Sequence, residues 1–449
     1  MFSISVDLPS SRPDIAIYKK SPEGIKELNI KWFRLHTSAW VITGLISTVA
    51  VWISCTNGAD HTATGVNDAD TAGVLFQSRY ASSAACQSCH PDIYQKYIQT
   101  THFRATQIAT RDKVPGSFKP GNNFYRFNVS ETIKCIDSNG RMYQQVYING
   151  VNKKQQSFDI IFGAGKNAQS YASWVGNRLV QLPLSYFSYI KKWNNSPGYP
   201  DKIVLNRVIT SRCLECHTTN AKVIAVNGVF EDFDKSGVLY GVGCEKCHGP
   251  GMEHINFETQ HPHTQDTVHI INPKKFSRQQ ELDLCAVCHS GSMNKLQPAF
   301  SFKPGDKLSD YYLPNIVSAG AENLDVHGNQ FGLLSLSKCF SKSDMTCNSC
   351  HDPHANEENQ FQVFSQKCMR CHTEAGNNFC TLKEVKANPL KANCINCHMP
   401  VQPSKAIVFT EQGTRKRIPA AMRTHLIKVY PQETAKLIKY IKGNNINFR

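Results

Sequence analysis

The sequence lacks several patterns that mark common classes of protein. Its glycines show neither Rossmann nor Walker spacing, and Gly163 and Gly165 therefore do not form a nucleotide-binding loop. The apolar run from Ala39 to Ile53 is short for a membrane span. Acidic residues are in deficit, with 35 Asp and Glu against 50 Lys and Arg and a formal net charge of +15. These absences argue against a nucleotide-dependent enzyme and leave an excess of positive charge to be explained.

Cysteine is the abundant residue, with 18 copies in 449 residues. The pattern Cys-x-x-Cys-His occurs seven times and uses fourteen of these cysteines. The cysteine pairs are Cys86 and Cys89, Cys213 and Cys216, Cys244 and Cys247, Cys285 and Cys288, Cys347 and Cys350, Cys368 and Cys371, and Cys394 and Cys397. The histidines that complete the motifs are His90, His217, His248, His289, His351, His372 and His398.

This spacing is typical of covalent haem attachment. Two thiols three positions apart can add to the two vinyl groups of one haem, and the adjacent histidine then provides the proximal ligand to the iron. Zinc would need the cysteine pairs to associate two by two, and would not need a histidine after every pair. A disulfide scaffold would need no histidine either. The sequence therefore predicts seven covalently attached c-type haems.

The haems would also offset most of the positive net charge of the protein. Each haem carries two propionates, so seven add about fourteen negative charges and nearly offset the excess of the protein. We therefore expect no binding of nucleic acid. A remaining basic face would suit an acidic redox partner protein.

Residues 1–54 read as a leader with a signal or anchor segment. Lys31, Arg34 and His36 precede the apolar run, which ends at Ser54 and Cys55. A cysteine after a small residue suggests lipid attachment at Cys55, although Trp52 occupies a position where a lipobox usually has leucine. The alternative is an uncleaved membrane anchor. Both interpretations predict export and association with a membrane.

The composition divides the rest of the chain. Residues 55–80 predict a flexible tether, and 81–102 form a first haem segment with a helix beginning at Pro91. Residues 103–212 contain no haem motif and predict a small antiparallel β insert, with hairpin turns at Asn139-Gly140 and Asn149-Gly150. Residues 213–430 carry six motifs, and 431–449 form a C-terminal helix and tail.

So little chain per haem cannot build an ordinary apolar core in 213–430. We therefore expect a mostly α and irregular fold, in which the haems themselves form the core, with only the small β insert as regular sheet. This part should not fold without haem.

Histidines outside the motifs are enough to supply a second axial ligand to each iron, with eight candidates for seven positions. The chain has 17 histidines, of which seven are proximal and His36 and His61 lie in the leader and tether. His102 is about 18 Å along a straight helix from His90, and His354 is too close to His351 to reach the far face of the same haem, so both should ligate a neighbouring iron. The distal candidates are His102, His254, His269, His327, His354 and His425, with His261 and His263 as alternatives to His269.

Four cysteines lie outside the motifs: Cys55, Cys135, Cys339 and Cys380. In an oxidising compartment Cys339 and Cys380 could form a disulfide. The alternative is that both remain free thiols.

The residues around the motifs resemble the multihaem cytochrome c family, the group that includes the tetrahaem electron acceptor of hydroxylamine oxidoreductase. Cys86–Pro91 with His102, Gly243–Gly251 with His254, Met345–His354, and Cys397–Pro400 with His425 are similar to family signatures. The resemblance spans about residues 81–430. It implies stacked and perpendicular haem pairs that form a continuous path for electrons, and a location in the periplasm or at the cell surface.

Two functions are compatible with these features. The supply of histidines favours an electron carrier with mainly bis-histidine haems, placed between a membrane quinol oxidoreductase and a terminal partner. The alternative is an oxidoreductase that acts on a small nitrogen or sulfur compound at one five-coordinate haem. No Cys-x-x-Cys-Lys motif is present, which argues against a site of the nitrite reductase type. A third reading, a haem-bearing scaffold that docks through the β insert, overlaps the first.

A pyridine haemochrome assay of the purified holoprotein should give seven haems per chain. The double substitution Cys394→Ala and Cys397→Ala should lower the value to six, because one attachment site is lost, while Cys135→Ser should leave it at seven. A value well below seven in the unsubstituted protein would contradict the prediction.

Overall fold

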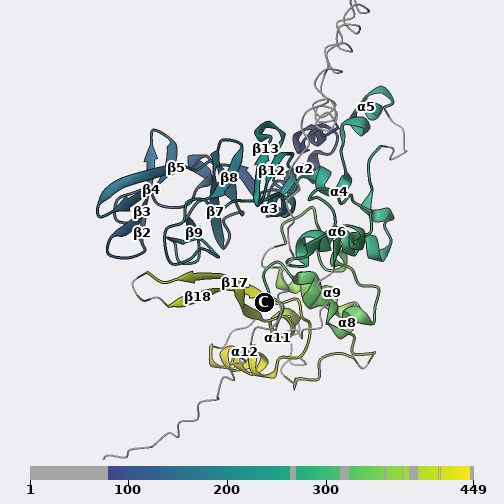
Figure 1. Cartoon of the computed structure of the whole chain (residues 1–449). Coiled ribbons are helices and arrows are strands. Elements are labelled where there is room, and N and C mark those ends of the chain that lie inside the picture. Colours follow the sequence, from purple (N-terminus) through teal and green to yellow (C-terminus); the bar gives the residue numbers. More distant parts are fainter. Residues whose placement is uncertain are drawn as a thin grey trace, which may run out of the picture. The chain divides into compact units, whose positions relative to one another are not determined.

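The structure is a computed structural model that describes residues 79–262, 269–313, 323–357, 360–376, 378–383, 393–412, 414 and 416–444 (Figure 1). All of these belong to one compact unit, Asn67–Arg449. The leader, most of the tether and the lipidation candidate Cys55 lie outside the described residues. Within the described ranges, no helix has both the length and the apolar character needed to cross a membrane.

Two antiparallel sheets dominate the first half of the described chain (Figure 1). The larger sheet has eight strands in the order β1-β6-β7-β8-β13-β12, with β9 paired to β7 and β10 paired to β9. Its strands are β1 (Thr106–Ile108), β6 (Ile160–Phe162), β7 (Ala168–Val175), β8 (Arg178–Gln181), β9 (Leu184–Phe187), β10 (Lys192–Asn195), β12 (Val223–Asn227) and β13 (Phe230–Phe233). The smaller sheet has the order β2 (Phe124–Arg126), β3 (Glu131–Ser138), β4 (Arg141–Ile148) and β5 (Val151–Ser157).

The two Asn-Gly hairpin turns are confirmed. Ser138 pairs with Arg141 across the first turn, and Ile148 pairs with Val151 across the second. Asn139 and Asn149 have φ values of 52° and 50°, and a glycine with positive φ follows each of them. Two successive residues with positive φ match the right-handed twist of a hairpin, which is why Asn-Gly is favoured there.

The sheets enclose a conventional apolar core. Trp193 lies at its centre, with Phe118, Phe158, Tyr171 and Tyr186 around it at ring-centroid distances between 5.5 and 5.9 Å. The Trp193 indole donates a hydrogen bond of 2.7 Å to the Ser117 carbonyl oxygen. Because apolar side chains of the chain itself fill this core, the β-rich part does not depend on haem for its interior.

The expectation of a mostly α and irregular fold with a small β insert is wrong. The fold is mixed α/β, and its eight-stranded sheet takes β12 and β13 from beyond residue 212. Two features explain why the sequence did not predict the eight-stranded sheet. Strand β9 is buried along its whole length and does not alternate, and β12 and β13 lie between two haem motifs, where we expected only helices and loops.

The segment that carries the later motifs consists of short helices and two-stranded sheets. The α-helices are α2 (Pro91–Tyr97), α3 (Ser211–His217), α4 (Cys244–His248), α5 (Met252–Gln260), α6 (Arg278–His289), α7 (Gln330–Ser335), α8 (Lys338–Ser341), α9 (Phe361–Met369), α11 (Cys394–His398) and α12 (Pro431–Asn444). The 3-10 turns are η1 (Ser83–Ser88), η2 (Arg111–Lys113), η3 (Lys235–Gly237), η4 (Pro273–Lys275), η5 (Leu308–Asp310) and η7 (Cys347–Ser349). The small sheets pair β11 (Thr218–Asn220) with β14 (Leu239–Tyr240), β15 (Asn294–Lys295) with β16 (Tyr312–Leu313), and β17 (Val401–Thr410) with β18 (Arg417–Arg423).

The β17–β18 hairpin packs against the β-rich part. The ring of Phe409 lies 5.1 Å from that of Phe187, and the Tyr125 hydroxyl donates to the carbonyl oxygen of Thr410. At the register shift of β17, Asp325 accepts hydrogen bonds from the backbone amides of Lys405 and Ala406. Asp325 therefore connects this hairpin to the loop that carries His327.

Removing apolar volume from the β core should destabilise the β-rich part alone. Ile133 is fully buried in that core, so Ile133→Ala should lower the free energy of unfolding by about 2–5 kcal/mol. The matched control is Val151→Ala, because Val151 is 55% exposed and surface substitutions change stability by about 0.5 kcal/mol or less. Urea unfolding followed by far-UV circular dichroism checks this, and equal midpoints for the two variants would contradict it.

Candidate haem centres

Each of the seven motifs lies at a short helical turn or at the end of a helix. In three motifs the histidine forms a hydrogen bond back to the first cysteine and so closes one helical turn. The backbone amides of His90, His351 and His372 donate to the carbonyl oxygens of Cys86, Cys347 and Cys368 at 2.9 to 3.0 Å. A helical turn brings residues three apart to the same side of the backbone. This geometry presents both sulfurs of a motif together, and all fourteen motif cysteines have free sulfurs.

Cysteines of different motifs lie next to one another. Hydrogen bonds from the thiol of Cys86 to Cys244 and from that of Cys216 to Cys288 raise the pKa of Cys86 and of Cys216. The first contact joins the first and third motifs, and the second joins the second and fourth.

Two further contacts extend this arrangement. Hydrogen bonds raise the pKa of Cys285 beside Cys347 and of Cys368 beside Cys394. Weaker charge repulsion from Cys247 acts on the pKa of Cys285, and from Cys350 on that of Cys368. The attachment sites therefore follow one another in the order first, third, fourth, fifth, sixth and seventh, with the second beside the fourth.

The proximal histidines are oriented by hydrogen bonds at Nδ1. The Nδ1 atoms of His248, His372 and His398 lie 2.9 to 3.0 Å from backbone carbonyl oxygens, and that of His289 lies 3.0 Å from Oε1 of Gln330. A partner at one ring nitrogen fixes the tautomer and leaves the other nitrogen as the metal ligand. In these four motifs Nε2 is the atom left for iron, so the donor set fits haem.

Three distal candidates face a proximal histidine of another motif. The ring centroids are 6.0 Å apart for His102 and His289, 6.0 Å for His248 and His354, and 6.2 Å for His351 and His425. With metal–nitrogen bonds of about 2.0–2.1 Å, two imidazoles on one metal ion have centroids about 6 Å apart. The chain thus places three pairs of imidazoles at the separation that a shared iron requires.

Two of the distal candidates, His102 and His425, are also kept neutral. Burial, assisted by neighbouring histidines, lowers the pKa of His102 and of His425 to about 4. Only the neutral ring has a lone pair for a metal, so the surroundings favour the ligating form.

The other predicted distal ligands are placed differently. His254 lies 3.8 Å from Glu258, His269 lies 2.8 Å from Glu253, and the ring of His261 stacks on Phe257 at 4.5 Å. His263 lies outside the described residues. Among the described residues, no second imidazole stands at the 6 Å spacing from His90, His217, His372 or His398.

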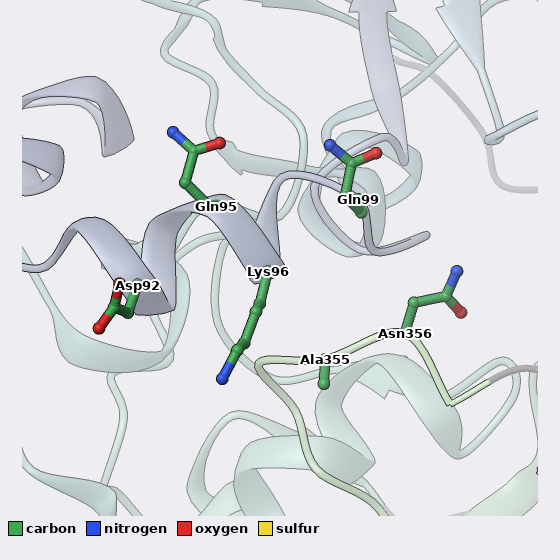
Figure 2. A pocket seen from close by; sticks show the side chains of 6 residues that line it. All are labelled: Asp92, Gln95, Lys96, Gln99, Ala355 and Asn356. Atoms are coloured by element: carbon green, nitrogen blue, oxygen red, sulfur yellow. The ribbon is translucent and has the colours of Figure 1, made fainter.

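A cavity lies between helix α2 and the loop that follows His354 (Figure 2). Its volume is about 610 Å³, and it is lined by Asp92, Gln95, Lys96, Gln99, Ala355 and Asn356. Such a volume is within the usual range for cofactor sites, about 300–1,000 Å³. Asp92, Gln95 and Lys96 lie on α2, and Gln99 lies just beyond its end.

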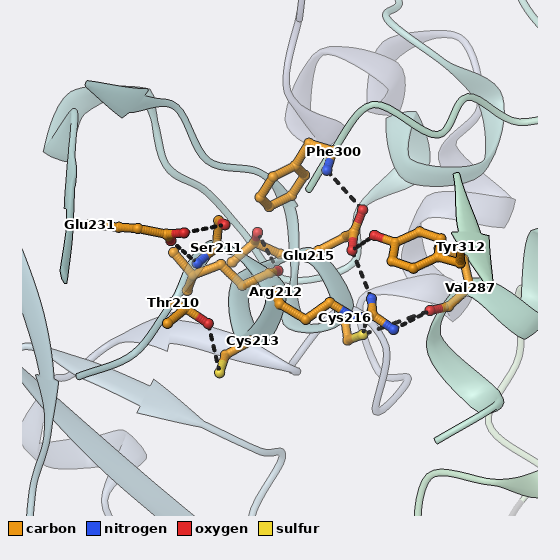
Figure 3. A network of polar contacts seen from close by, with 12 residues as sticks. Thr210, Ser211, Arg212, Cys213, Glu215, Cys216, Glu231, Val287, Phe300 and Tyr312 are labelled. Carbon is orange, nitrogen blue, oxygen red and sulfur yellow. Dashed lines mark hydrogen bonds and ion pairs between the residues drawn. The ribbon is translucent and has the colours of Figure 1, made fainter. Parts of the chain in front are cut away.

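A buried polar network joins the second motif to the fourth (Figure 3). Glu215 is 1% exposed and accepts hydrogen bonds from the Arg212 guanidinium, the Tyr312 hydroxyl and the backbone amide of Phe300. Arg212 also donates to the carbonyl oxygen of Val287, which lies inside the fourth motif. No sequence pattern predicted this network, and an acidic residue between the two cysteines of a motif was the one available signal.

The first and third motifs have a comparable connection. Glu245, inside the third motif, accepts hydrogen bonds from the backbone amides of Ala81, Ser82 and Gly251 at 2.7 to 3.0 Å. Ala81 and Ser82 directly precede the turn that carries Cys86. A buried carboxylate inside a motif therefore fixes a neighbouring motif in both cases.

The remaining cysteines are free where the structure describes them. Cys135 is fully buried in the β core, and burial raises the pKa of its thiol. Cys339 and Cys380 are partly exposed and carry free sulfurs, which corresponds to the free-thiol alternative.

The comparisons with known proteins define the class. Residues 85–159 and 191–249 match the family described as "Cytochrome c554 and c-prime". The match supports the interpretation of the chain as a multihaem c-type cytochrome, a class of protein that works outside the cytoplasm. The match includes three of the seven motif regions, and the number of haems stays a prediction.

Two individual proteins are similar to this chain. The dissimilatory sulfite reductase MccA of Wolinella succinogenes is 21% identical over 373 aligned residues, which cover 72% of this chain and 48% of that protein. This chain therefore spans about half the length of its curated relative. The crystal structure of the outer cell wall cytochrome OcwA matches with a TM-score of 0.51 and 15% identity, over 80% of this chain and 81% of that one. The second likeness concerns the fold alone.

The pairing of His354 with His248 can be tested by spectroscopy. His354→Ala should leave seven haems attached but add one high-spin haem equivalent to the electron paramagnetic resonance spectrum, because one iron loses a strong-field ligand. Lys436→Ala is the control, since Lys436 is an exposed side chain on α12 and should leave the spectrum unchanged. If His354→Ala adds no high-spin signal, His354 is not an iron ligand.

Proposed function

We propose that this protein is a multihaem oxidoreductase that delivers electrons to a small sulfur or nitrogen compound at one haem with an open distal face. Two observations support the proposal. The relative from Wolinella succinogenes is named a sulfite reductase. The histidines are also distributed unequally, since three motifs have a second imidazole at ligand spacing and the other four have none among the described residues.

The second motif is our candidate for the open site. Burial lowers the pKa of His217, and a hydrogen bond to the carbonyl oxygen of Ala105 holds its ring. Phe162 lies edge-to-face against the same ring at 5.7 Å. His217 is therefore well fixed by the protein, yet none of the described histidines faces it at the spacing seen in the three closed pairs.

His327 is the residue we expect to act beside this haem. It is close enough to His217 to contribute to lowering the pKa of that ring. Its backbone amide donates to Asp325, whose carboxylate also binds the amides of β17. Asp325 thus fixes the loop that carries His327, and an imidazole held there can donate a hydrogen bond to an oxygen atom of a bound substrate.

The remaining motifs would supply electrons to this site. Haem bound to the attachment sites provides one-electron chemistry, and their order from first to seventh, with the second beside the fourth, gives a path that reaches the second motif through the fourth. We propose a membrane quinol oxidoreductase as the electron donor. We also propose that the protein is attached to the membrane through Cys55 or through the apolar run before it.

An electron carrier without its own substrate is the second candidate. The three closed imidazole pairs favour it, because bis-histidine iron is coordinatively saturated and changes little on reduction. In that case His327 would be the distal ligand at the second motif rather than a residue that binds substrate.

Electron paramagnetic resonance of the oxidised holoprotein, combined with turnover assays, separates the two functions. The proposal expects about one high-spin haem equivalent, a spectral shift on adding sulfite, nitrite or hydroxylamine, and turnover of at least one of them with a reduced dye as donor. Spectra with low-spin signals alone and no turnover would leave the electron carrier as the function.

The substitution His327→Ala sharpens this test. For the oxidoreductase it should lower turnover by about 10²–10⁴-fold, the usual contribution of a positioned proton donor, without adding a second high-spin equivalent. A new high-spin signal in this variant would identify His327 as an iron ligand and contradict its proposed role. Lys436→Ala is the control, because Lys436 is an exposed side chain on α12 that pairs with Glu433.

A further inference from the structure

The network at Arg212 does more than hold two motifs together. One guanidinium nitrogen of Arg212, Nη1, lies 2.7 Å from Oε2 of Glu215 and 3.2 Å from Sγ of Cys216. The other, Nη2, lies 3.0 Å from the carbonyl oxygen of Val287. Figure 3 shows the guanidinium between the second motif and Val287. A positive charge is thus fixed directly at a sulfur that attaches haem, and beside a second motif.

This charge is poorly screened. The side chains of Arg212 and Glu215 are 21% and 2% exposed, and the pair also contacts the aromatic ring of Tyr312, which lies 4.8 Å from the guanidinium carbon. Charges in such surroundings interact more strongly than charges in water, and salt screens them less. The Arg212 charge therefore acts on whatever is bound at Cys216.

The third motif has the opposite arrangement. Glu245 is 5% exposed, and the hydrogen bonds it accepts come from three backbone amides. A full negative charge is held there by dipoles, whereas at the second motif a full positive charge balances the carboxylate. The two buried glutamates occupy comparable positions inside their motifs but leave different local charge.

Reduction of ferric haem to ferrous haem adds one electron and no other atom. A fixed cation stabilises the added negative charge, and a fixed anion destabilises it, so charges and hydrogen bonds near the attachment sulfurs shift the reduction potential. We propose that Arg212 raises the reduction potential of the haem attached at Cys213 and Cys216, and that Glu215 holds Arg212 in place while moderating its effect.

The consequence is a direction for electron transfer. The second motif becomes an electron acceptor relative to the first and third motifs, where Glu245 favours the oxidised form. This inference concerns the chain's own charges and holds whether the second haem reduces a substrate or only passes electrons on.

Potentiometric titration of the holoprotein, followed by visible spectra, tests the proposal. Arg212→Gln should move one redox transition to lower potential. We expect the equilibrium constant for reduction to fall tenfold or more, which corresponds to about 59 mV for one electron. Glu215→Gln should move the same transition to higher potential, because Arg212 is then unopposed. Arg212→Lys keeps the charge and should restore most of the original value.

Opposite shifts are the decisive outcome. If Arg212 and Glu215 were only structural, both glutamine variants would lose the same contact and move the transition in the same direction. That result, or no shift in either variant, would overturn the proposal. Lys436→Gln is the matched control, since the Lys436 side chain on α12 is exposed and pairs with Glu433. Haem content and the low-spin signals verify folding, and if Arg212→Gln does not fold, Glu215→Gln and Arg212→Lys still give the sign.

Discussion

Three pairs of imidazoles lie 6.0 to 6.2 Å apart, the separation that two ligands of one metal ion need, and we infer that this requirement organises the molecule. It brings His102, which follows the first motif, to His289 of the fourth, and His425, near the end of the chain, to His351 of the fifth. Segments that are far apart in sequence thus become neighbours without an extensive apolar interface. The β-rich part, with Trp193 at its centre, follows ordinary packing rules and forms the remainder of the framework.

The buried carboxylates complement this requirement. They join motifs that the imidazole pairs do not connect: the Glu215 network links the second motif to the fourth, and Glu245 links the third motif to the backbone just before the first. Burial of an ionised group is costly unless it is fully paired, and both glutamates have three partners. Their position between the motif cysteines means that the same residue that fixes the backbone also sets the local charge.

The sequence was most informative where chemistry fixes the spacing. The seven motifs identified a multihaem c-type cytochrome, and the Asn-Gly turns located two hairpins, because both patterns have a local cause. The size of the sheet could not be predicted in the same way. Strand β9 is buried on both faces and does not alternate, and β12 and β13 join the sheet only through pairing with β8. The partners of His102 and His425 were equally beyond the sequence, since a histidine carries no local signal for the motif that it will face.

The contact between the first and third motifs has a consequence for how the protein is made. Ser82 and Glu245, which meet in this contact, are separated by 163 positions, and the strands β1 to β13 lie between them in the chain. Because a chain is synthesised from its N-terminus, the first motif is present long before the segment with Glu245 that contacts it. The β-rich part can fold in the interval, because its core is made of its own side chains. The sheets can therefore form before the contact between the first and third motifs is complete.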